Sequence, residues 1–253
     1  MRTSFLYIFI AFTFFACTGI HRHDASLASS TEPLDTVKLI PAKITANPIL
    51  FENAFVKGTT RKVDTSTINF YGVTIGKIKI VSGRIIACDP LHVDEYGLSY
   101  TQVFPVGEFP VQLSIASVGD EELIVFARIN FSDEPVERWQ LALLKGEKPL
   151  PVGDEEFHGY SVDAGVGIFM DEEGLKGLDQ SKLYGNDSEL FKEMEKHYHN
   201  TWKYAMYNFG AHNLAAFSTG GGDGRYATYI GFDATGKPCR LVTDFGIFDW
   251  RKK

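Results

Sequence analysis

Cysteine is scarce in this sequence, and its spacing excludes the common cysteine-based sites. The 253 residues contain three cysteines, which are Cys17, Cys88 and Cys239. No two of them form a C-x-x-C motif, so neither a zinc finger nor a disulfide framework is expected. In an oxidising compartment Cys88 and Cys239 could form one disulfide, but two separate buried thiols are the favoured interpretation.

Positive charge is also in deficit. The chain carries 25 lysine and arginine residues against 32 aspartate and glutamate residues, which gives a net charge of −7 at pH 7. Because a nucleic-acid-binding surface must neutralise phosphates, no nucleic-acid partner is expected. The hydrophobic content of 44% is typical of a folded protein rather than of a disordered chain.

Familiar catalytic motifs are missing from the sequence as well. It contains no Gly-x-Ser-x-Gly nucleophile elbow and no kinase catalytic loop. The glycine cluster at 220–224 leads into Arg225 and a predicted strand, whereas a phosphate-binding loop continues through lysine into a helix. We therefore interpret this cluster as the tip of a hairpin.

Only one long apolar run is present, and it lies at the start of the chain. Arg2 precedes an apolar stretch from Phe5 to Ala16, and Cys17 and a polar stretch follow. The run is shorter than the roughly 20 residues that span a bilayer, and it is typical of an export signal. We expect a lipoprotein-type signal peptide over residues 1–16, with lipid such as palmitate attached at Cys17. Ordinary secretion and an uncleaved anchor are the alternatives.

The expected location is therefore the bacterial cell envelope, with the membrane as a partner through the lipid on Cys17 and the protein facing the periplasm or the exterior. Residues 17–45 are rich in serine, threonine and alanine, and they predict a flexible tether. His21 and His23 in this tether are interpreted as exposed residues rather than as metal ligands. Residues 46–253 are predicted to form a single globular domain.

Strand patterns dominate this predicted domain. Residues 77–81 alternate between polar and apolar side chains, which indicates a strand with one solvated face. Short strands separated by turns favour an antiparallel arrangement. Residues 188–206 instead carry apolar side chains at three- and four-residue steps, which indicates a helix. The predicted fold class is α+β, a mostly antiparallel β meander or sandwich-like sheet with one long helix (about 188–206) packed on it.

Aspartates at the ends of predicted strands are the main candidate site residues. These are Asp89, Asp163, Asp223, Asp233 and Asp244. Carboxylates can bind a hard cation or act as acid and base, although aspartate also closes turns. Asp163 is the strongest candidate because its neighbours are expected to be buried, and Arg225 or Arg84 could be its charge partner. His158 lies nearby in the sequence and could act with Asp163.

Several segments together resemble one known family. In chain order they are residues 76–78, 82–91, 106–111, 139–142, 159–165 and 222–226, followed by Gly231, Asp233, Gly236 and Asp244-Phe245. They resemble the bacterial family named domain of unknown function 4241 from about residue 68 to residue 245. The resemblance implies a single domain and a feature shared by Asp89, Asp163, Asp223 and Asp244. It implies no reaction, cofactor or role for any residue.

An export signal without a recognised catalytic motif predicts a non-catalytic module that binds a protein or a small ligand at the envelope. One alternative is a cation-dependent hydrolase that uses strand-end aspartates, with Asp163 and Asp223 as the principal pair. The other is an immunity-type inhibitor of a toxin, which requires an acidic surface complementary to a basic partner. The candidate binding or catalytic residues are Asp89, His158, Asp163, Asp223, Arg225 and Asp244. The sequence identifies no cofactor.

Overall fold

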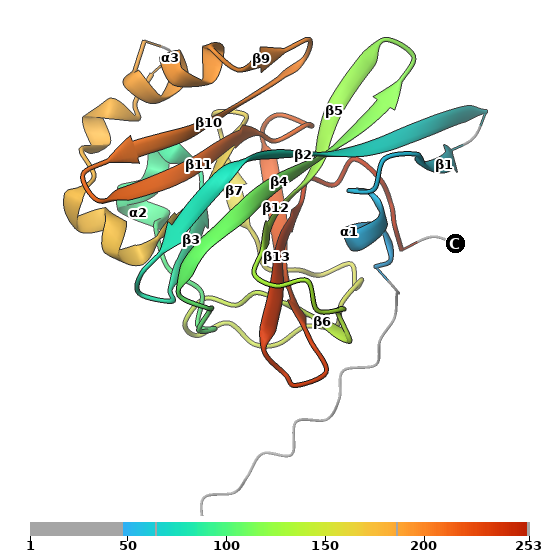
Figure 1. Ribbon diagram of the computed structural model, residues 1–253, viewed down its shortest axis with the longest axis horizontal. Coiled ribbons are helices and arrows are strands. Elements are labelled where there is room, and N and C mark those ends of the chain that lie inside the picture. The colour runs from blue at the N-terminus through green and yellow to red at the C-terminus, as the bar shows by residue number, and fades with distance from the viewer. Residues whose placement is uncertain (1–47, 64, 186, 252–253) are drawn as a thin grey trace, which may run out of the picture. The chain divides into compact units, whose positions relative to one another are not determined.

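The computed structural model describes residues 48–63, 65–185 and 187–251, and antiparallel β-structure dominates these ranges (Figure 1). The strands form two sheets, one of eight strands and one of five. The predicted signal peptide, the tether and the lipid attachment at Cys17 lie outside the described residues. No helix within the described ranges is long and apolar enough to cross a bilayer.

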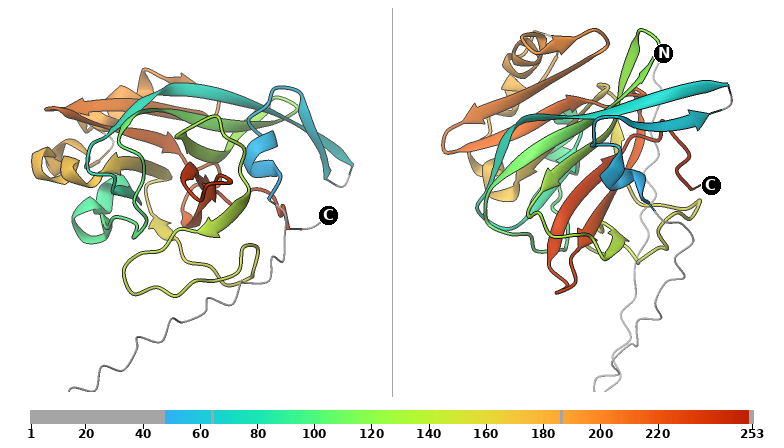
Figure 2. Two further views of the ribbon diagram at one scale, coloured as in Figure 1. Left: turned by 60° about the horizontal axis from the view of Figure 1, so that its bottom comes forward. Right: turned by 45° about the vertical axis from the view of Figure 1, so that its right-hand side comes forward.

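The larger sheet follows the order β1-β2-β4-β5-β13-β12-β6, and β7 also pairs with β12. Its strands are β1 Thr59–Val63, β2 Ser66–Ile80, β4 Gly107–Val118, β5 Glu121–Asn130, β6 Arg138–Leu141, β7 Tyr160–Val162, β12 Gly224–Phe232 and β13 Pro238–Asp244. All neighbours are antiparallel. Register shifts interrupt three of these pairs, and such bulges bend a strand. The sheet is correspondingly curled (Figure 2).

The smaller sheet follows the order β3-β8-β11-β10-β9. Its strands are β3 Ile85–Cys88, β8 Val166–Asp171, β9 Tyr198–His199, β10 Trp202–Phe209 and β11 His212–Ser218. Buried side chains from both sheets, such as Ile78, Phe169 and Phe217, belong to one hydrophobic cluster, so the main core lies between the sheets. The helices are short, and they are α1 Leu50–Asn53, α2 Val93–Tyr96 and α3 Glu189–Glu195.

The predicted helix over 188–206 is wrong in its second half. The Ser188 hydroxyl caps α3 by accepting a hydrogen bond from the amide of Phe191 (3.3 Å). The helix ends at Glu195, and the chain then turns at Asn200, which has a φ of 48°. Trp202 begins β10, which pairs with β9 at its first two residues and with β11 from Tyr204 to Phe209. The apolar spacing fitted a helix, but aromatic residues pairing with a neighbouring strand determine the structure here.

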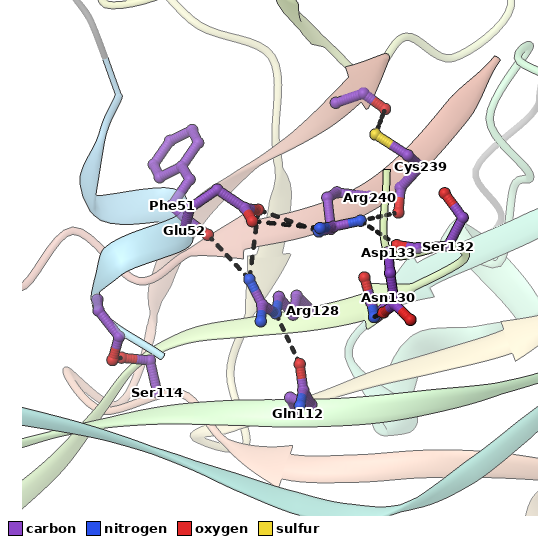
Figure 3. A network of polar contacts seen from close by, with 12 residues as sticks. Phe51, Glu52, Gln112, Ser114, Arg128, Asn130, Ser132, Asp133, Cys239 and Arg240 are labelled. Atoms are coloured by element: carbon purple, nitrogen blue, oxygen red, sulfur yellow. Dashed lines mark hydrogen bonds and ion pairs between the residues drawn. The ribbon is translucent and has the colours of Figure 1, made fainter. Parts of the chain in front are cut away.

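A buried arginine and a partly buried one attach α1 to the larger sheet (Figure 3). Glu52 on α1 accepts hydrogen bonds from Arg240 Nε on β13 (3.1 Å) and from Arg128 Nη1 on β5 (3.3 Å). Arg128 also lies over the ring of Phe55, 3.8 Å from its centroid. Burial lowers the pKa of Arg128 to about 10, and the negative charge of Glu52 opposes this shift. The negative charge of Glu52 therefore stabilises the positive charges of both desolvated guanidinium groups.

Phe51 completes this attachment from the apolar side. Its ring is fully buried and contacts the rings of Phe126, Trp139 and Trp250, with centroids 4.9 to 5.4 Å apart. Burial of one phenylalanine stabilises a fold by roughly 1.5–3 kcal/mol. A helix of four residues is therefore held by its tertiary contacts rather than by its own hydrogen bonds.

Candidate functional site

Asp89 is buried at the end of β3, and backbone amides bind both of its oxygens. Oδ1 accepts a hydrogen bond from the amide of Leu91 (2.7 Å) and caps the short 3₁₀ helix that follows. Oδ2 accepts hydrogen bonds from the amides of Asp163 (2.7 Å) and Ala164 (3.0 Å). Three backbone donors thus satisfy this carboxylate, which joins the end of β3 to the segment that enters β8.

Asp171 at the end of β8 has the reciprocal role. Its Oδ1 accepts a hydrogen bond from the amide of Glu173 (3.0 Å) and caps a second 3₁₀ helix. Its Oδ2 accepts hydrogen bonds from the amides of Val81 and Ser82, both at 3.0 Å, just before β3. Since β3 and β8 are antiparallel neighbours, each aspartate anchors the entrance of the other strand. Asp171 is absent from the sequence-based candidates, although an aspartate before Glu172-Glu173 is a recognisable helix cap.

Asp223 binds the same segment as Asp89. Its Oδ1 accepts a hydrogen bond from the amide of Gly165 (3.1 Å), so two aspartates bind the consecutive amides of residues 163–165. Gly165 has a φ of 61°, a conformation that suits glycine. Three of the four aspartates that share the family resemblance, Asp89, Asp163 and Asp223, therefore meet at one loop. Two of them act there through backbone hydrogen bonds.

Asp244 and Asp233 lie in other turns. Asp244 accepts hydrogen bonds from the amide of Gly246 (2.9 Å) and from Trp250 Nε1 (2.6 Å), and it thereby fixes the C-terminal turn. Asp233 closes its own hairpin by accepting hydrogen bonds from the amides of Thr235 and Lys237. The structure assigns both residues to turns rather than to the loop at 163–165.

Asp163 has a different environment and a different partner from those expected. Its side chain is 71% exposed, and its Oδ2 lies 3.2 Å from Nε2 of His92. Arg225 instead donates a hydrogen bond to the carbonyl of Gly159 (3.3 Å), and Arg84 donates to the carbonyls of Tyr100 and Thr101. The sequence-based pairing with either arginine is therefore wrong, and the Asp163 carboxylate forms an exposed imidazole–carboxylate pair.

This pair lies at a cavity of about 420 Å³. β12 pairs with β7 at residues 224–226 and with β6 at residues 229–232. Thr228 lies between these two segments of β12 and lines the cavity. The cavity is lined by Ala87, His92, Tyr96, Leu98, Tyr100, Ala142, Leu144, Glu147, His158, Gly159, Tyr160, Ser161, Asp163 and Thr228. Its wall thus combines apolar and aromatic side chains with a small number of ionisable groups.

His158 reaches the same cavity but does not pair with Asp163. Its Nδ1 lies 3.4 Å from Oε1 of Glu147, and its Nε2 lies 2.9 Å from the carbonyl of Lys148. Oε2 of Glu147 accepts a hydrogen bond from the amide of Leu144 (2.7 Å), which fixes the carboxylate. The cavity therefore has a second imidazole–carboxylate pair. The sequence pattern does not predict it, because Glu147 does not lie at a predicted strand end.

Hydroxyl groups lie deep in this region. Thr228 Oγ1 and Thr243 Oγ1 form a hydrogen bond of 2.8 Å. The hydroxyl of Tyr160 is buried. Burial raises the pKa of Tyr160 well above its usual range, the neighbouring Tyr100 adds to this shift, and the hydroxyl of Thr243 opposes it. Tyr160 therefore lines the cavity as a neutral phenol, through atoms other than its buried oxygen.

The ionisable groups do not form a metal site in the described part of the chain. Across those residues, no three histidine, cysteine, aspartate or glutamate side chains are grouped closely enough to hold a metal ion. Cys88 and Cys239, on β3 and β13, are buried and carry no disulfide within the described ranges.

Comparison with known proteins gives one match. A family model described as "Protein of unknown function (DUF4241)" matches residues 78–243. The matched range runs from the end of β2 to the end of β13, so it contains every residue that lines the cavity and the aspartates that hold the loop at 163–165. No curated protein and no solved structure matches the chain.

Asp244 predicts a distinct pH dependence of stability. Burial raises its pKa from 3.8 to about 6, and hydrogen bonds from Trp250 and Gly246 oppose this shift. The folded state thus holds the proton more tightly than the unfolded state. The stabilisation that Asp244 adds to the free energy of unfolding is therefore complete below about pH 4 and is lost as pH rises through about 6. We expect the unfolding free energy of wild type relative to Asp244→Asn to fall by at most about 3 kcal/mol over this range.

Urea unfolding at a series of pH values measures this difference. Asp233→Asn is the control with the opposite trend, because hydrogen bonds from Thr235 and Lys237 lower the pKa of Asp233. The stabilisation that Asp233 adds to the free energy of unfolding should therefore be lost as pH falls through the acid range. A wild-type to Asp244→Asn difference that stays constant between about pH 4 and 6 would contradict the assignment.

Proposed function

Because the chain belongs to the DUF4241 family, whose description names no activity, we propose from the site itself that this protein binds a small ligand in the cavity lined by His92, Tyr160 and Asp163. The observation that carries the proposal is the cavity's composition. Small-molecule sites are concave, largely apolar and lined by a few fixed polar groups. The present cavity combines these properties with a volume of about 420 Å³.

The rigidity of the polar groups supports binding. His92 follows Asp89 in the capped 3₁₀ helix, and the amide of Asp163 is bound by the same carboxylate. Glu147 is fixed by the amide of Leu144, and His158 contacts the carbonyl of Lys148. A site whose groups are held before a ligand arrives loses less conformational entropy on binding.

A hydrolase is the second candidate, in a form that differs from the aspartate pair. Asp223 uses Oδ1 to hold the amide of Gly165, so it serves the loop rather than an open reaction centre. The imidazole of His92, 3.2 Å from Asp163, is the group in this cavity best placed to act as a general base. Turnover that requires His92 would favour this candidate over simple binding.

We also propose that the protein is displayed at the cell envelope through lipid on Cys17. The support is the apolar run that ends at Ala16, followed by a polar segment. Such an anchor would present the binding domain to molecules outside the cytosol.

Blocking the cavity should abolish ligand binding without unfolding the protein. Ser161 is exposed on β7 and lines the cavity, so Ser161→Trp is expected to fill the entrance and leave the core intact. Ligand-observed NMR with a neutral-to-charged fragment library should detect binders for wild type, and about tenfold weaker or no binding for Ser161→Trp. Ser66→Trp, on an exposed position of β2, is the matched control. Fragments that bind Ser161→Trp as well as wild type would place the site elsewhere.

The lipid anchor predicts that labelling depends on one cysteine. Cells grown with a labelled fatty acid should yield labelled, membrane-associated protein from wild type and from Cys239→Ala, because Cys239 is buried in the fold. Cys17→Ala should lose the label and leave the membrane fraction. Retention of the label by Cys17→Ala would refute the anchor.

A further inference from the structure

We infer that the cavity selects a small organic cation, an amine carried on an apolar or aromatic body. The inference rests on the proposed function, since it names the class of ligand for the same site. It follows from three properties of the lining: the sign of its charges, its aromatic surface and its apolar wall.

The charged groups of the lining disfavour an anion. The carboxylates are Glu147 and Asp163, and no lysine or arginine is present among the described residues that line the cavity. The only basic side chains there are His92 and His158, and each already lies beside one of the carboxylates. An anionic ligand would leave water without a permanent positive charge to compensate it, whereas a cation would meet two carboxylates.

Aromatic rings strengthen this preference. Tyr96, Tyr100 and Tyr160 all line the cavity, and the hydroxyl of Tyr160 is buried away from it. Tyr160 therefore presents carbon atoms rather than its oxygen. An ammonium group over a tyrosine ring gains about 0.5–2 kcal/mol, with the larger values where water is excluded.

The remaining wall requires that the cation carry an apolar body. Ala87, Ala142 and Leu144 contribute aliphatic surface inside the cavity. Leu98 and Tyr96 continue this surface outward, and these two side chains are 58% and 56% exposed. A bare ammonium ion would leave this surface hydrated, so the complementary ligand combines one positive charge with apolar or aromatic carbon.

Three probes of matched shape separate charge from shape. Tryptamine, tryptophol and indole-3-acetate share the indole ring and carry an ammonium group, a hydroxyl group and a carboxylate. Calorimetric titration of the purified protein at neutral pH should show tryptamine binding about tenfold more tightly than indole-3-acetate, with tryptophol between them. Asp163→Asn should reduce the preference for tryptamine over tryptophol at least threefold, because it removes one exposed carboxylate. Asp120→Asn, in the exposed turn between β4 and β5, should leave the preference unchanged.

The outcomes distinguish this inference from the proposed function. Equal affinities, a preference for indole-3-acetate or no measurable binding of the three probes would overturn the cation preference. The fragment experiment with Ser161→Trp tests the cavity separately, because its library includes neutral and acidic compounds. Cavity-dependent binding of acidic fragments would therefore sink the inference and leave the proposed function standing.

Discussion

The carboxylate of Asp89 positions both halves of the His92–Asp163 pair. One oxygen accepts a hydrogen bond from Leu91 and caps the 3₁₀ helix that carries His92, and the other binds the amides of Asp163 and Ala164. The group is buried, so its charge is compensated by backbone donors rather than by water. Charge-assisted hydrogen bonds of this kind contribute roughly 1.5–3 kcal/mol each, so Asp89 stabilises the two segments that carry His92 and Asp163. Asp171 supports the opposite end of the same strand pair.

Those hydrogen bonds explain why a cavity can persist between two strands that pair with β12. β6 and β7 are short, and beyond β6 only the amide of Ala142 continues the pairing, through a hydrogen bond to the carbonyl of Thr228 (2.8 Å). Other contacts therefore fix the surrounding loops. Asp89 and Asp223 fix the loop at 163–165, while Glu147 fixes the turn after Leu144. The ionisable groups at the surface of the cavity are therefore carried by rigid backbone. A ligand would meet a site that is already formed.

The sequence predicts the mostly antiparallel sheets and the DUF4241 family. The alternation of polar and apolar residues along strands and the residues that form turns are local signals that the sequence itself carries. It fails at 188–206, where apolar spacing fits a helix but the residues from Tyr204 onward pair with β11, a contact made only in the folded chain. It identifies Asp89 and Asp223 but not their task, since their partners lie about 75 and 58 residues away in sequence. The pairing of His92 with Asp163 depends on the same long-range contact, so local spacing gave no signal for it.

The most direct test of the role of Asp89 is amide hydrogen exchange combined with urea unfolding of Asp89→Asn, with Asp163→Asn as the control. An asparagine turns one oxygen acceptor into a donor, so we expect a loss of about 2–4 kcal/mol in unfolding free energy and faster exchange centred on the amides of residues 91, 163 and 164. The control should change stability by less than about 0.5 kcal/mol, because the Asp163 side chain is mostly exposed. An Asp89→Asn variant with wild-type stability and unchanged exchange at those three amides would contradict the account.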